Sequence, residues 1–394
     1  MMEPKIRFKG FEGEWKATLF SEMVERISAS GQAGMLPGVE FEDIASGEGC
    51  FNKNIYQKEC HKYGKLFYEG DILFGKLRPY LKNIILADFN GVAIGDFWVL
   101  RSKGLDEKYL YTLVNSESFL KVANISSGSK MPRADWNLVS TTKFVVPSAK
   151  DEQKAIGKYF TTLDSQISAS TSRLASLKQM KAASLQAMFP QEGETVPKIR
   201  FKEFEGEWTW LKLGDISERV KRKAPINSTA PVMMISALNG FINQSEKYSD
   251  NNAGSSLANY TLLKKGELSY NHGYSKTRNF GSCFNLLVEE ARIPFVYHSF
   301  RLTNDNDSFY AYYLNSGTKD KDLKRLVSST ARMDGLLNIS FKNYMELSVP
   351  HPSLAEQQAI ASYFTSLDRQ ISLQSQRLEK LKQIKSACLD KMFV

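Results

Sequence analysis

The sequence predicts an α+β fold built as an internal repeat, in which two similar mixed α/β domains are joined by two long helices. Two duplications support this prediction. Residues 152–189 return at 356–393, with 22 of 38 positions identical at a constant offset of 204. The leader PKIRFKGFEGEW at 4–15 returns at 197–208 with a single difference. The chain therefore consists of a leader, a segment and a long helix, followed by a second leader, segment and long helix in the same order.

Both copies of the helical segment carry one apolar stripe, whose members follow each other at steps of four and three residues. This 3.5-residue spacing is typical of helices that pair along their length. The stripe comprises Ile156, Phe160, Leu163, Ile167, Leu174 and Leu177 in the first copy, and Ile360, Phe364, Leu367, Ile371, Leu378 and Leu381 in the second. A polar residue, Ser170 or Gln374, interrupts each stripe and helps to fix the register.

Two helices of equal sequence in one chain can pair antiparallel. We therefore expect an antiparallel coiled coil, with the two domains related by a pseudo-twofold axis. Each helix would be about 57 Å long at 1.5 Å per residue, and an amphipathic helix of that length needs a partner. The alternative is that each helix lies on a globular core. Duplication of the whole stripe favours mutual pairing.

Prolines divide the chain at the ends of the predicted helices, because proline cannot continue a helix. Ser353 and Glu356 are spaced as a capping box at the start of the second helix. The predicted organisation is a first domain at 1–147 with its leader at 4–15, a first spacer helix at 148–189, a linker at 190–196, a second domain at 197–350 with its leader at 197–208, and a second spacer helix at 351–394.

Short sequence segments recur at equivalent places in the two domains, although the rest of the two domain sequences diverges. Alternating and apolar runs bounded by glycine or proline predict short strands, and longer periodic runs predict helices. Predicted strands include GDILFGK at 70–76 opposite GELSYNH at 266–272, KFVVP at 143–147 opposite MELSVP at 345–350, and the runs at 83–86 and 91–94; residues 107–122 are predicted to be helical. The two domains should share one fold and differ in their surfaces.

Composition places the chain among ordinary globular proteins. It has 394 residues, 42% hydrophobic and 24% charged, which is enough for two or more domains. An excess of 52 Lys and Arg over 43 Asp and Glu gives a net charge of +9, which suits a polyanionic partner but is weak evidence alone. The sequence lacks an 18-residue apolar run and a signal segment, so we expect a soluble cytoplasmic protein without a membrane contact. Cys50, Cys60 and His61 leave a metal site open, but free thiols in a reducing cytosol are favoured.

The sequence shows no pattern of catalytic residues. Gly70, Gly75 and Lys76 are spaced like the start of a P-loop, but Leu77 stands where Ser or Thr must hold magnesium. No GxGxxG precedes a predicted helix, and neither an Asn-Pro-Pro-aromatic tetrapeptide nor a Pro-Asp with Glu-x-Lys nuclease pattern occurs. The four histidines lack metal or triad spacing. We therefore expect a non-catalytic chain that holds no cofactor and no metal.

Polar and basic clusters in both domains predict DNA recognition. Arg and Lys can pair with guanine, Asn can pair with adenine, and all of them can hold phosphates. The predicted DNA-binding residues are Lys76, Arg78, Lys82, Lys130 and Arg133 in the first domain, and Asn271, His272, Tyr274, Lys276, Arg278 and Arg332 in the second. The segment 271–279 is the densest of these clusters. For each residue taken singly, an ordinary solvated loop is the competing interpretation.

The chain resembles the specificity subunit of type I restriction-modification systems along its whole length. The resemblance rests on the EQ-x-x-I-x-x-[YF]-F-x-x-L-D-x-x-I helix starts at 152–167 and 356–371, the leaders ending in GEW, the segment GDILFGKLRPYLKN at 70–83, and the pre-helix loops containing Lys130-Met131 and Arg332-Met333. It implies two target-recognition domains, each reading one half of a bipartite, asymmetric DNA site. The length of the paired helices would then set the gap between the half-sites.

The resemblance also implies partners. These are double-stranded DNA, two methyltransferase (modification) subunits that carry S-adenosylmethionine and methylate adenine, and the restriction nuclease-translocase subunits. The helices and leaders would dock the methyltransferase subunits, and this chain would be the non-catalytic subunit of the restriction-modification enzyme. The alternatives are a coiled-coil scaffold that binds protein partners, an enzyme with an unrecognised site, and a dimeric repressor. Basic loops argue against the scaffold, and the repressor lacks a helix-turn-helix signal.

Overall fold

The computed structural model describes residues 3–34, 36–57, 61–125, 131–225, 227–246, 257, 259–273, 275, 278–327 and 337–393. The chain divides into two compact units. The first unit holds Met1–Ala175 with Leu373–Val394, and the second unit holds Ser176–Ser372. Each unit therefore combines one mixed α/β domain with pieces of both long helices, and the predicted α+β class is confirmed.

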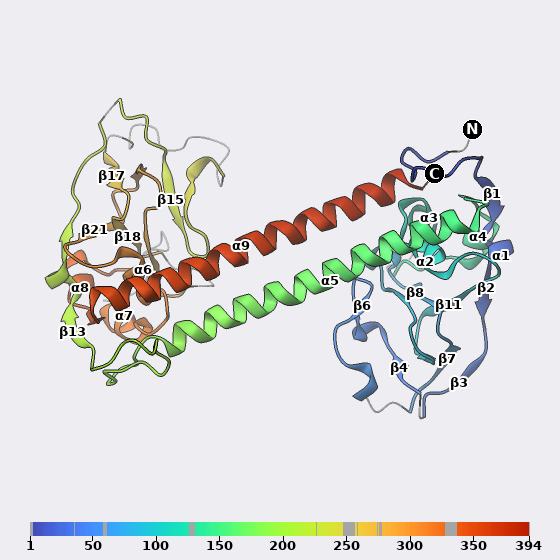
Figure 1. Ribbon diagram of the computed structural model, residues 1–394, viewed down its shortest axis with the longest axis horizontal. Helices are drawn as coiled ribbons and strands as arrows, with labels where there is room; N and C mark the ends of the chain where they lie inside the picture. The colour runs from blue at the N-terminus through green and yellow to red at the C-terminus, as the bar shows by residue number, and fades with distance from the viewer. Residues whose placement is uncertain are drawn as a thin grey trace. The chain divides into compact units, whose positions relative to one another are not determined.

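The domain of the first unit consists of short strands followed by three short helices (Figure 1). Its elements are β1 (Lys16–Leu19), α1 (Phe20–Met23), β2 (Val24–Ile27), β3 (Ser30–Gln32), β4 (Gly38–Val39), η1 (Phe41–Asp43), β5 (Ile44–Ala45), β6 (Cys50–Phe51), η2 (Ile55–Gln57), β7 (Tyr63–Phe67), β8 (Ile72–Gly75), η3 (Pro79–Leu81), β9 (Ile84–Leu86), β10 (Gly91–Ala93), β11 (Phe97–Ser102), α2 (Glu107–Asn115), α3 (Glu117–Ala123), α4 (Trp136–Thr141) and β12 (Lys143–Val146).

Two four-stranded sheets form the centre of this domain. One has the order β2-β11-β8-β9 and is antiparallel throughout, and the other has the order β3-β7-β10-β4, in which β10 and β4 run parallel. Strand β8 is buried at all four positions, since its sheet is covered by the helices on one face and by the second sheet's core on the other. The predicted strand runs at 70–76, 83–86 and 91–94 correspond to β8, β9 and β10.

The predicted helical run at 107–122 is wrong in one respect, because it is two helices. Ser116 ends α2 and begins α3, and it is fully buried. Its hydroxyl donates to the carbonyl of Leu113 at 2.6 Å and accepts from the amide of Phe119 at 3.3 Å. A serine that bonds the backbone on both sides can satisfy two helix ends at once, which a continuous helix would not require.

The domain of the second unit repeats this plan with fewer regular strands. Its elements are β13 (Thr209–Lys212), η4 (Leu213–Ile216), β14 (Ser217–Arg219), β15 (Met233–Ser236), β16 (Gly240–Asn243), η5 (Gln244–Glu246), β17 (Thr261–Lys264), β18 (Leu268–Asn271), β19 (Ser282–Asn285), β20 (Glu290–Ile293), β21 (His298–Leu302), α6 (Asp307–Leu314), α7 (Asp320–Leu326), α8 (Phe341–Met345) and β22 (Ser348–His351). The sheet β14-β21-β18-β19 matches β2-β11-β8-β9, and the pair β13-β22 matches β1-β12.

The two long helices are α5 (Lys150–Ala187) and α9 (Leu354–Lys391), and they pair antiparallel inside each unit. In the first unit Asp164 and Lys385 form an ion pair at 2.5 Å, and Gln374 donates to the carbonyl of Ser170 at 3.2 Å. The second unit contains the reciprocal ion pair of Lys181 and Asp368, also at 2.5 Å. The polar layer predicted at Ser170 and Gln374 is thus a direct hydrogen bond.

The apolar stripe divides into a buried and a half-buried part. Buried members are Ile156, Phe160, Leu163, Ile167, Leu177, Ile360, Phe364 and Leu367, and half-buried members are Leu174, Ile371, Leu378 and Leu381. Of these, Ile156, Phe160 and Leu163 belong to the core of the first unit, and Ile360 and Phe364 belong to the core of the second. The start of each helix therefore packs into its own domain as well as against its helical partner.

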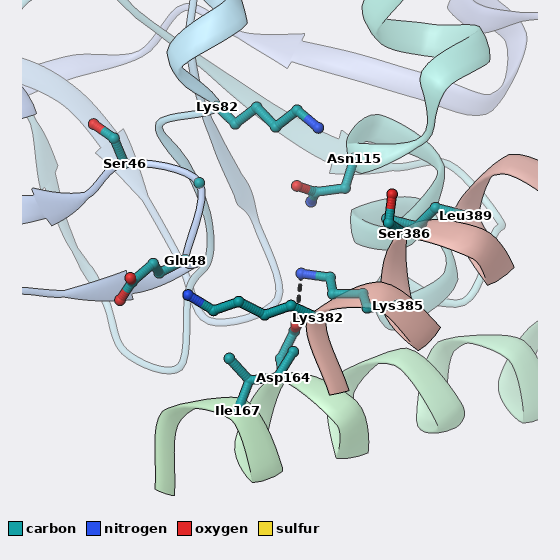
Figure 2. A pocket seen from close by; sticks show the side chains of 11 residues that line it. Ser46, Glu48, Lys82, Asn115, Asp164, Ile167, Lys382, Lys385, Ser386 and Leu389 are labelled. Atoms are coloured by element: carbon teal, nitrogen blue, oxygen red, sulfur yellow. Dashed lines mark ion pairs between the residues drawn. The ribbon is translucent and has the colours of Figure 1, made fainter. Parts of the chain in front are cut away.

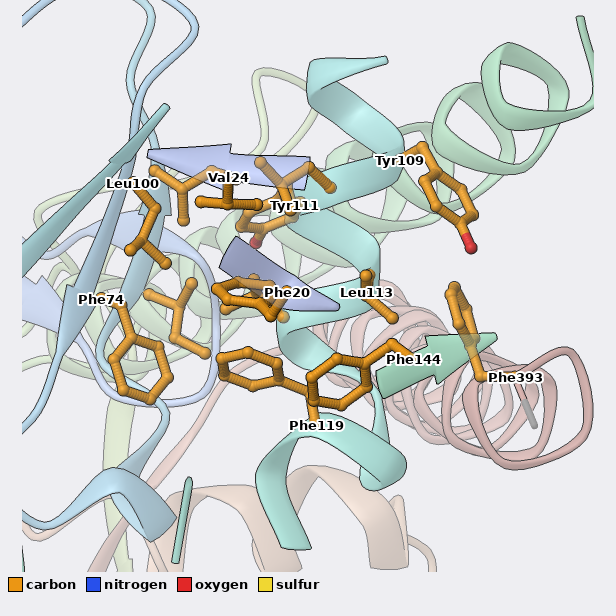
Figure 3. Close-up of a cluster of buried hydrophobic side chains, with 14 of the residues drawn as sticks. Phe20, Val24, Phe74, Leu100, Tyr109, Tyr111, Leu113, Phe119, Phe144 and Phe393 are labelled. Carbon is orange, nitrogen blue, oxygen red and sulfur yellow. The ribbon is translucent and has the colours of Figure 1, made fainter. Parts of the chain in front are cut away.

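Each long helix also contributes its last residues to the core of the other domain. Met392 and Phe393 follow α9 and are buried in the core of the first unit, where Phe393 stacks on Tyr109 at 5.8 Å between ring centroids (Figure 3). Met188 and Phe189 follow α5 and are buried in the core of the second unit. A core that needs aromatic side chains from the other repeat couples the two halves of the chain.

Each leader forms hydrogen bonds with the first turn of the long helix of its own repeat. Arg7 and Trp15 both donate to the buried carboxylate of Glu152, with the Arg7 Nε atom at 2.7 Å from Oε1. Arg200 and Trp208 bind Glu356 in the same way. The expected capping box at Ser353 is therefore half formed: its hydroxyl accepts from the Glu356 amide at 3.3 Å, while the Glu356 carboxylate binds the leader instead.

Candidate nucleic-acid interface

A loop after β8 presents several of the predicted DNA-binding residues in the first unit. Arg78 and Lys82 flank the short helix η3, and both have left-handed backbone conformations, with φ of 50° and 53°. Non-glycine residues rarely adopt this region, and such strain is usually found at functional sites. Arg78 is exposed, and no hydrogen bond or ion pair of its guanidinium occurs within the described residues.

The segment around Arg133 runs beside this loop and is held there by backbone hydrogen bonds. Leu77 and Arg133 form an antiparallel bridge, and the Arg78 amide donates to the carbonyl of Pro132 at 2.8 Å. The Ala134 amide donates to the carbonyl of Lys76 at the same distance. The structure thus brings together residues that are far apart in sequence; the predicted Lys130 lies outside the described residues.

Asp96 links the two basic segments. Its carboxylate accepts from Lys76 at 3.2 Å and from the guanidinium of Arg133 at 3.1 Å. Burial alone would raise the pKa of the Asp96 carboxyl, but the hydrogen bonds and charges of Lys76 and Arg133 outweigh burial and hold the pKa below its ordinary value. One carboxylate therefore orients two cations while leaving a net positive charge.

Two further cations, Arg26 on β2 and Lys65 on β7, lie near Lys76, and the sequence reasoning missed them. The pKa of Lys65 is lowered by burial first, and then by the charges of Arg26 and Lys76. The guanidinium of Arg26 sits over the ring of Trp136 at 4.8 Å, as Arg219 sits over Phe341 at 4.4 Å in the second unit. Both domains have an arginine on the first strand of the main sheet and an aromatic residue at the start of a helix. This recurrence in the sequence could have drawn attention to Arg26.

Lys82 faces a different environment, a cavity of about 290 Å³ within the first unit. Figure 2 shows Lys82 beside Asn115 on α2, opposite Lys382 and Lys385 from the end of α9. Lys385 is engaged by Asp164, whose pKa is raised by burial and lowered less strongly by Lys385. The cavity therefore contains two cations, Lys82 and Lys382, that are not held in an ion pair by any described residue.

In the second unit, two of the predicted DNA-binding side chains have interior roles. His272 is 9% exposed, and its Nδ1 and Nε2 atoms face the carbonyl oxygens of Leu337 and Val296 at 2.7 and 2.9 Å. Its ring also stacks on His298 at 4.9 Å between centroids. Asn271 donates to the carbonyl of Ile235 at 3.3 Å and accepts from the Gly273 amide at 3.0 Å. Both side chains shape the loop that follows β18 and have few groups left for a ligand.

Arg278 ends that loop in a half-buried position. Burial lowers the pKa of its guanidinium, and the nearby charge of Asp320 opposes the change. The Arg278 amide donates to the Ser275 carbonyl at 3.2 Å, and the Ser275 amide donates to the Arg278 carbonyl at 3.1 Å. The remaining predicted residues of this domain, Tyr274, Lys276 and Arg332, lie outside the described residues, so the second domain is described in less detail than the first.

Other classes of site find no support within the described part of the chain. That part contains no group of three or more His, Cys, Asp or Glu side chains arranged to hold a metal ion. None of its helices combines the length and apolar character that a membrane span requires. Cys50, Cys283 and Cys388 are free thiols. The polar features that remain are the cationic surface of Arg26, Lys65, Lys76, Arg78 and Arg133, and the cavity beside Lys82.

Comparisons with known proteins agree with this description. Residues 205–383 match the family model of the type I restriction modification DNA specificity domain. The EcoDI type I restriction enzyme specificity subunit of Escherichia coli is 25% identical over 120 residues, which span 29% of this chain and 27% of that protein. The match thus covers about a quarter of the curated relative.

Solved structures resemble the chain over nearly its whole length. The S subunit of a type I restriction-modification system from M. genitalium has a TM-score of 0.63 at 16% identity, covering 100% of this chain and 99% of that one. The HsdS subunit of Thermoanaerobacter tengcongensis has a TM-score of 0.44 at 18% identity, covering 98% of each chain. The first likeness establishes a shared fold.

Proposed function

We propose that the chain is a specificity subunit of a type I restriction-modification complex and recognises DNA sequence for it, because residues 205–383 match the family model of the specificity domain and the fold resembles a solved S subunit. Each domain would read one half of a bipartite, asymmetric site, and the paired helices would set the gap between the halves. Methyltransferase subunits would dock on the chain and methylate adenine, and restriction subunits would join them to cut unmodified DNA. The chain itself supplies recognition and no catalytic group.

The observation that carries the proposal is the cationic surface of the first unit. Arg26 and Lys65 lie near Lys76, and the backbone of Arg78 lies beside the segment of Arg133. Asp96 binds both Lys76 and Arg133 directly. Burial lowers the pKa of Lys65 first, and the charges of Arg26 and Lys76 lower it further; a polyanion such as DNA would relieve the repulsion among these cations. An exposed arginine in a fixed loop can also donate two hydrogen bonds to a guanine.

The decisive experiment maps methylated adenines in DNA exposed to the reconstituted complex. The native chain is compared with a chimera in which residues 209–350 are exchanged for the equivalent domain of another specificity subunit. We expect one half of the recognised site to change and the other half to stay. A change in both halves, or methylation that ignores the exchange, would refute the assignment of one half-site to each domain.

A second experiment separates base contacts from phosphate contacts at Arg78. Replacement of Arg78 by alanine at a phosphate contact should weaken all DNA sequences alike and reduce the slope of log affinity against log salt by about one. At a base contact it should instead relax specificity at one position, at a cost of about 1–3 kcal/mol. Unchanged affinity and unchanged specificity would remove Arg78 from the interface. Replacement of exposed Lys121 on α3 serves as the control.

A further inference from the structure

The cavity beside Lys82 brings together polar side chains from separate parts of the first unit (Figure 2). Its volume is about 290 Å³, and its lining includes three lysines, Lys82, Lys382 and Lys385, and two acids, Glu48 and Asp164. Lys385 and Asp164 bind each other at 2.5 Å. Lys82 and Lys382 have no ion-pair partner within the described residues. Two positive charges that face this cavity are therefore left for a ligand.

The backbone fixes Lys82 at one side of the cavity. Its amide donates to the carbonyl of Pro79 at 3.0 Å, and its own carbonyl accepts from the amides of Gly47 and Ile84 at 3.2 and 2.9 Å. These bonds hold Lys82 at a φ of 53°, in the left-handed region that a lysine rarely adopts. A side chain on a fixed backbone loses less conformational freedom when it binds a ligand than one on a mobile loop.

The last turns of α9 form the opposite side of the cavity and are also anchored. Lys385 lies one turn after Lys382 and binds Asp164. The carbonyl of Lys391 accepts a hydrogen bond from the first leader at 3.1 Å, and Phe393 is buried in the core of the first unit. Lys382 therefore stands on a helix end that three separate contacts hold beside the first domain.

The second unit shows how protein groups can satisfy the same corner. Asp368 is the equivalent of Asp164, and it binds both Lys181 and the hydroxyl of Tyr312, the latter at 2.9 Å. The Lys181 ammonium also lies over the Tyr312 ring at 5.5 Å. In the first unit Thr112 takes the place of the tyrosine, and one carboxylate oxygen of Asp164 is buried without a partner in the described residues. A buried polar atom without a partner beside a cavity indicates water or a ligand.

The chemistry of the lining favours a phosphate group. Lysine binds phosphate as a compact charge with three donors, and the cations that line this cavity are all lysines. A phosphate monoester carries close to two negative charges at neutral pH, which matches the two unpaired ammonium groups. The volume is that of about ten water molecules, and it lies near the lower limit of small-molecule sites. A phosphate group that is attached to a larger organic group therefore fits better than a bare ion.

We propose that this cavity binds a phosphate group, carried by a small phosphate ester or by a DNA strand, and that Lys82 and Lys382 hold it from opposite sides. The bound phosphate would link the first domain to the last turns of α9, which come from the other end of the chain. The inference goes beyond the proposed function, because a small phosphate ester would bind here whether or not the chain reads a DNA sequence.

The first test titrates the full-length chain with adenosine monophosphate (AMP) and, separately, with inorganic phosphate in a calorimeter. AMP should bind with a Kd below about 1 mM, since two charged hydrogen bonds are available. Lys82→Ala and Lys382→Ala should each weaken binding at least about tenfold. Lys178→Ala is the matched control, because Lys178 is exposed and stands in α5 where α9 has Lys382. Glu48→Gln should strengthen binding, because it removes an acid from the lining.

A second readout separates a ligand in the cavity from a loose association with surface lysines. AMP should slow hydrogen exchange in residues 380–391, because a ligand that bridges the domain and α9 stabilises the helix end. The Lys382→Ala variant should lose this protection, and the Lys178→Ala variant should keep it. Circular dichroism verifies that each variant is folded. Protection that persists in Lys382→Ala would place the ligand elsewhere and overturn the inference.

The third test distinguishes the two sources of phosphate in the reconstituted complex. If a DNA strand supplies the group, the duplex should displace AMP, and Lys382→Ala should weaken duplex binding. If a small ester supplies it, AMP and the duplex should bind together, and Lys382→Ala should leave the duplex affinity unchanged. The inference is overturned when neither AMP nor inorganic phosphate binds and the duplex affinity ignores Lys382. AMP binding by a chain that ignores DNA sequence would refute only the proposed function, so the two failures are distinguishable.

Discussion

At the scale of single residues, positive charge is concentrated on the first domain at some cost. Arg78 and Lys82 hold left-handed backbone conformations, and Lys65 keeps its ammonium half-buried near two other cations. None of these features helps the isolated chain to fold, because strain and like-charge repulsion both oppose folding. The proposed negatively charged ligand, DNA, would account for these features, and it gives a prediction about pH.

DNA binding should weaken at alkaline pH because of Lys65. Its lowered pKa means that it loses its charge at a lower pH than an ordinary lysine, and bound DNA favours the charged form, so binding takes up a proton. Affinity of the reconstituted complex for its duplex should therefore fall as the pH rises through the Lys65 pKa. Fluorescence anisotropy from pH 7 upward measures this. Lys65→Arg should flatten the profile, and an identical slope in that variant would show that Lys65 does not contact the DNA.

At the scale of elements, the two ion pairs between the long helices are equivalent in sequence but differ in their surroundings. Asp368 binds Lys181 and also accepts from the hydroxyl of Tyr312 at 2.9 Å. Counted from the helix N-caps, Thr112 takes the place of Tyr312 in the first unit, and Asp164 Oδ2 is buried without a hydrogen-bond partner in the described residues. The Asp164 carboxylate therefore depends more strongly on Lys385 than the Asp368 carboxylate depends on Lys181.

Removal of the two lysines should have unequal effects. We expect Lys385→Met to destabilise the first unit by about 2 kcal/mol, since Asp164 would keep a buried charge without a cation. Lys181→Met should cost about 1 kcal/mol or less, since Asp368 is more exposed and retains the Tyr312 hydroxyl. Because burial raises the Asp164 pKa, the deficit of Lys385→Met should shrink as the pH is lowered. Thermal unfolding of both variants tests the order, and equal losses would contradict it.

The ends of the long helices form a second prediction at this scale. Phe393 is 7% exposed and packs on Tyr109 and Phe160, which belong to the first repeat (Figure 3). Phe393→Ala should destabilise the first unit by about 3 kcal/mol and raise hydrogen exchange in α2 without changing α6. Phe189→Ala is the reciprocal variant and should loosen α6 instead. Exchange that rises equally in both helices would show that the units do not respond separately.

At the scale of the whole molecule, each unit is assembled from pieces of both repeats. The first unit takes its leader and domain from the start of the chain and its last helical turns from the end, and the end of α9 lies beside the leader (Figure 1). An equivalent backbone hydrogen bond joins a leader to the end of a long helix in both units, from Ile6 to Lys391 of α9 and from Ile199 to Ala187 of α5. In one unit the polypeptide continues through residues 190–196, and in the other it does not.

A circularly permuted chain should therefore fold. The design joins Phe393 to Pro4 with a copy of residues 190–196 and opens the chain between the exposed residues Glu192 and Gly193. Because the buried cores of both units are preserved, we expect the melting midpoint to change by no more than about 3 °C. Differential scanning calorimetry provides the measurement. Insoluble product, or loss of the cooperative transition, would show that continuity at 190–196 is required.

Much of the architecture followed from the sequence alone. The duplication, the 3.5-residue stripe and the α+β character are local or periodic properties, and side-chain spacing along one segment determines them. The candidate interface was only partly predictable. Lys76, Arg78 and Arg133 were predicted because they stand in polar loops, and their contact with DNA stays a prediction. Arg26 and Lys65 were not predicted, because strand positions give no sign of which cations lie next to them. His272 was predicted as a contact residue, yet both of its ring nitrogens face backbone carbonyls.

The sequence by itself determined that the chain is a repeat with paired helices, two related domains and no recognisable catalytic pattern, because these properties are written in residue spacing. The tertiary structure alone decided that Asp96 gathers Lys76 and Arg133, that Phe393 completes the core of the first repeat, and that Lys82 and Lys382 line one cavity. Such contacts join residues that are distant in sequence, so they exist only once the backbone has brought them within a few ångströms of each other.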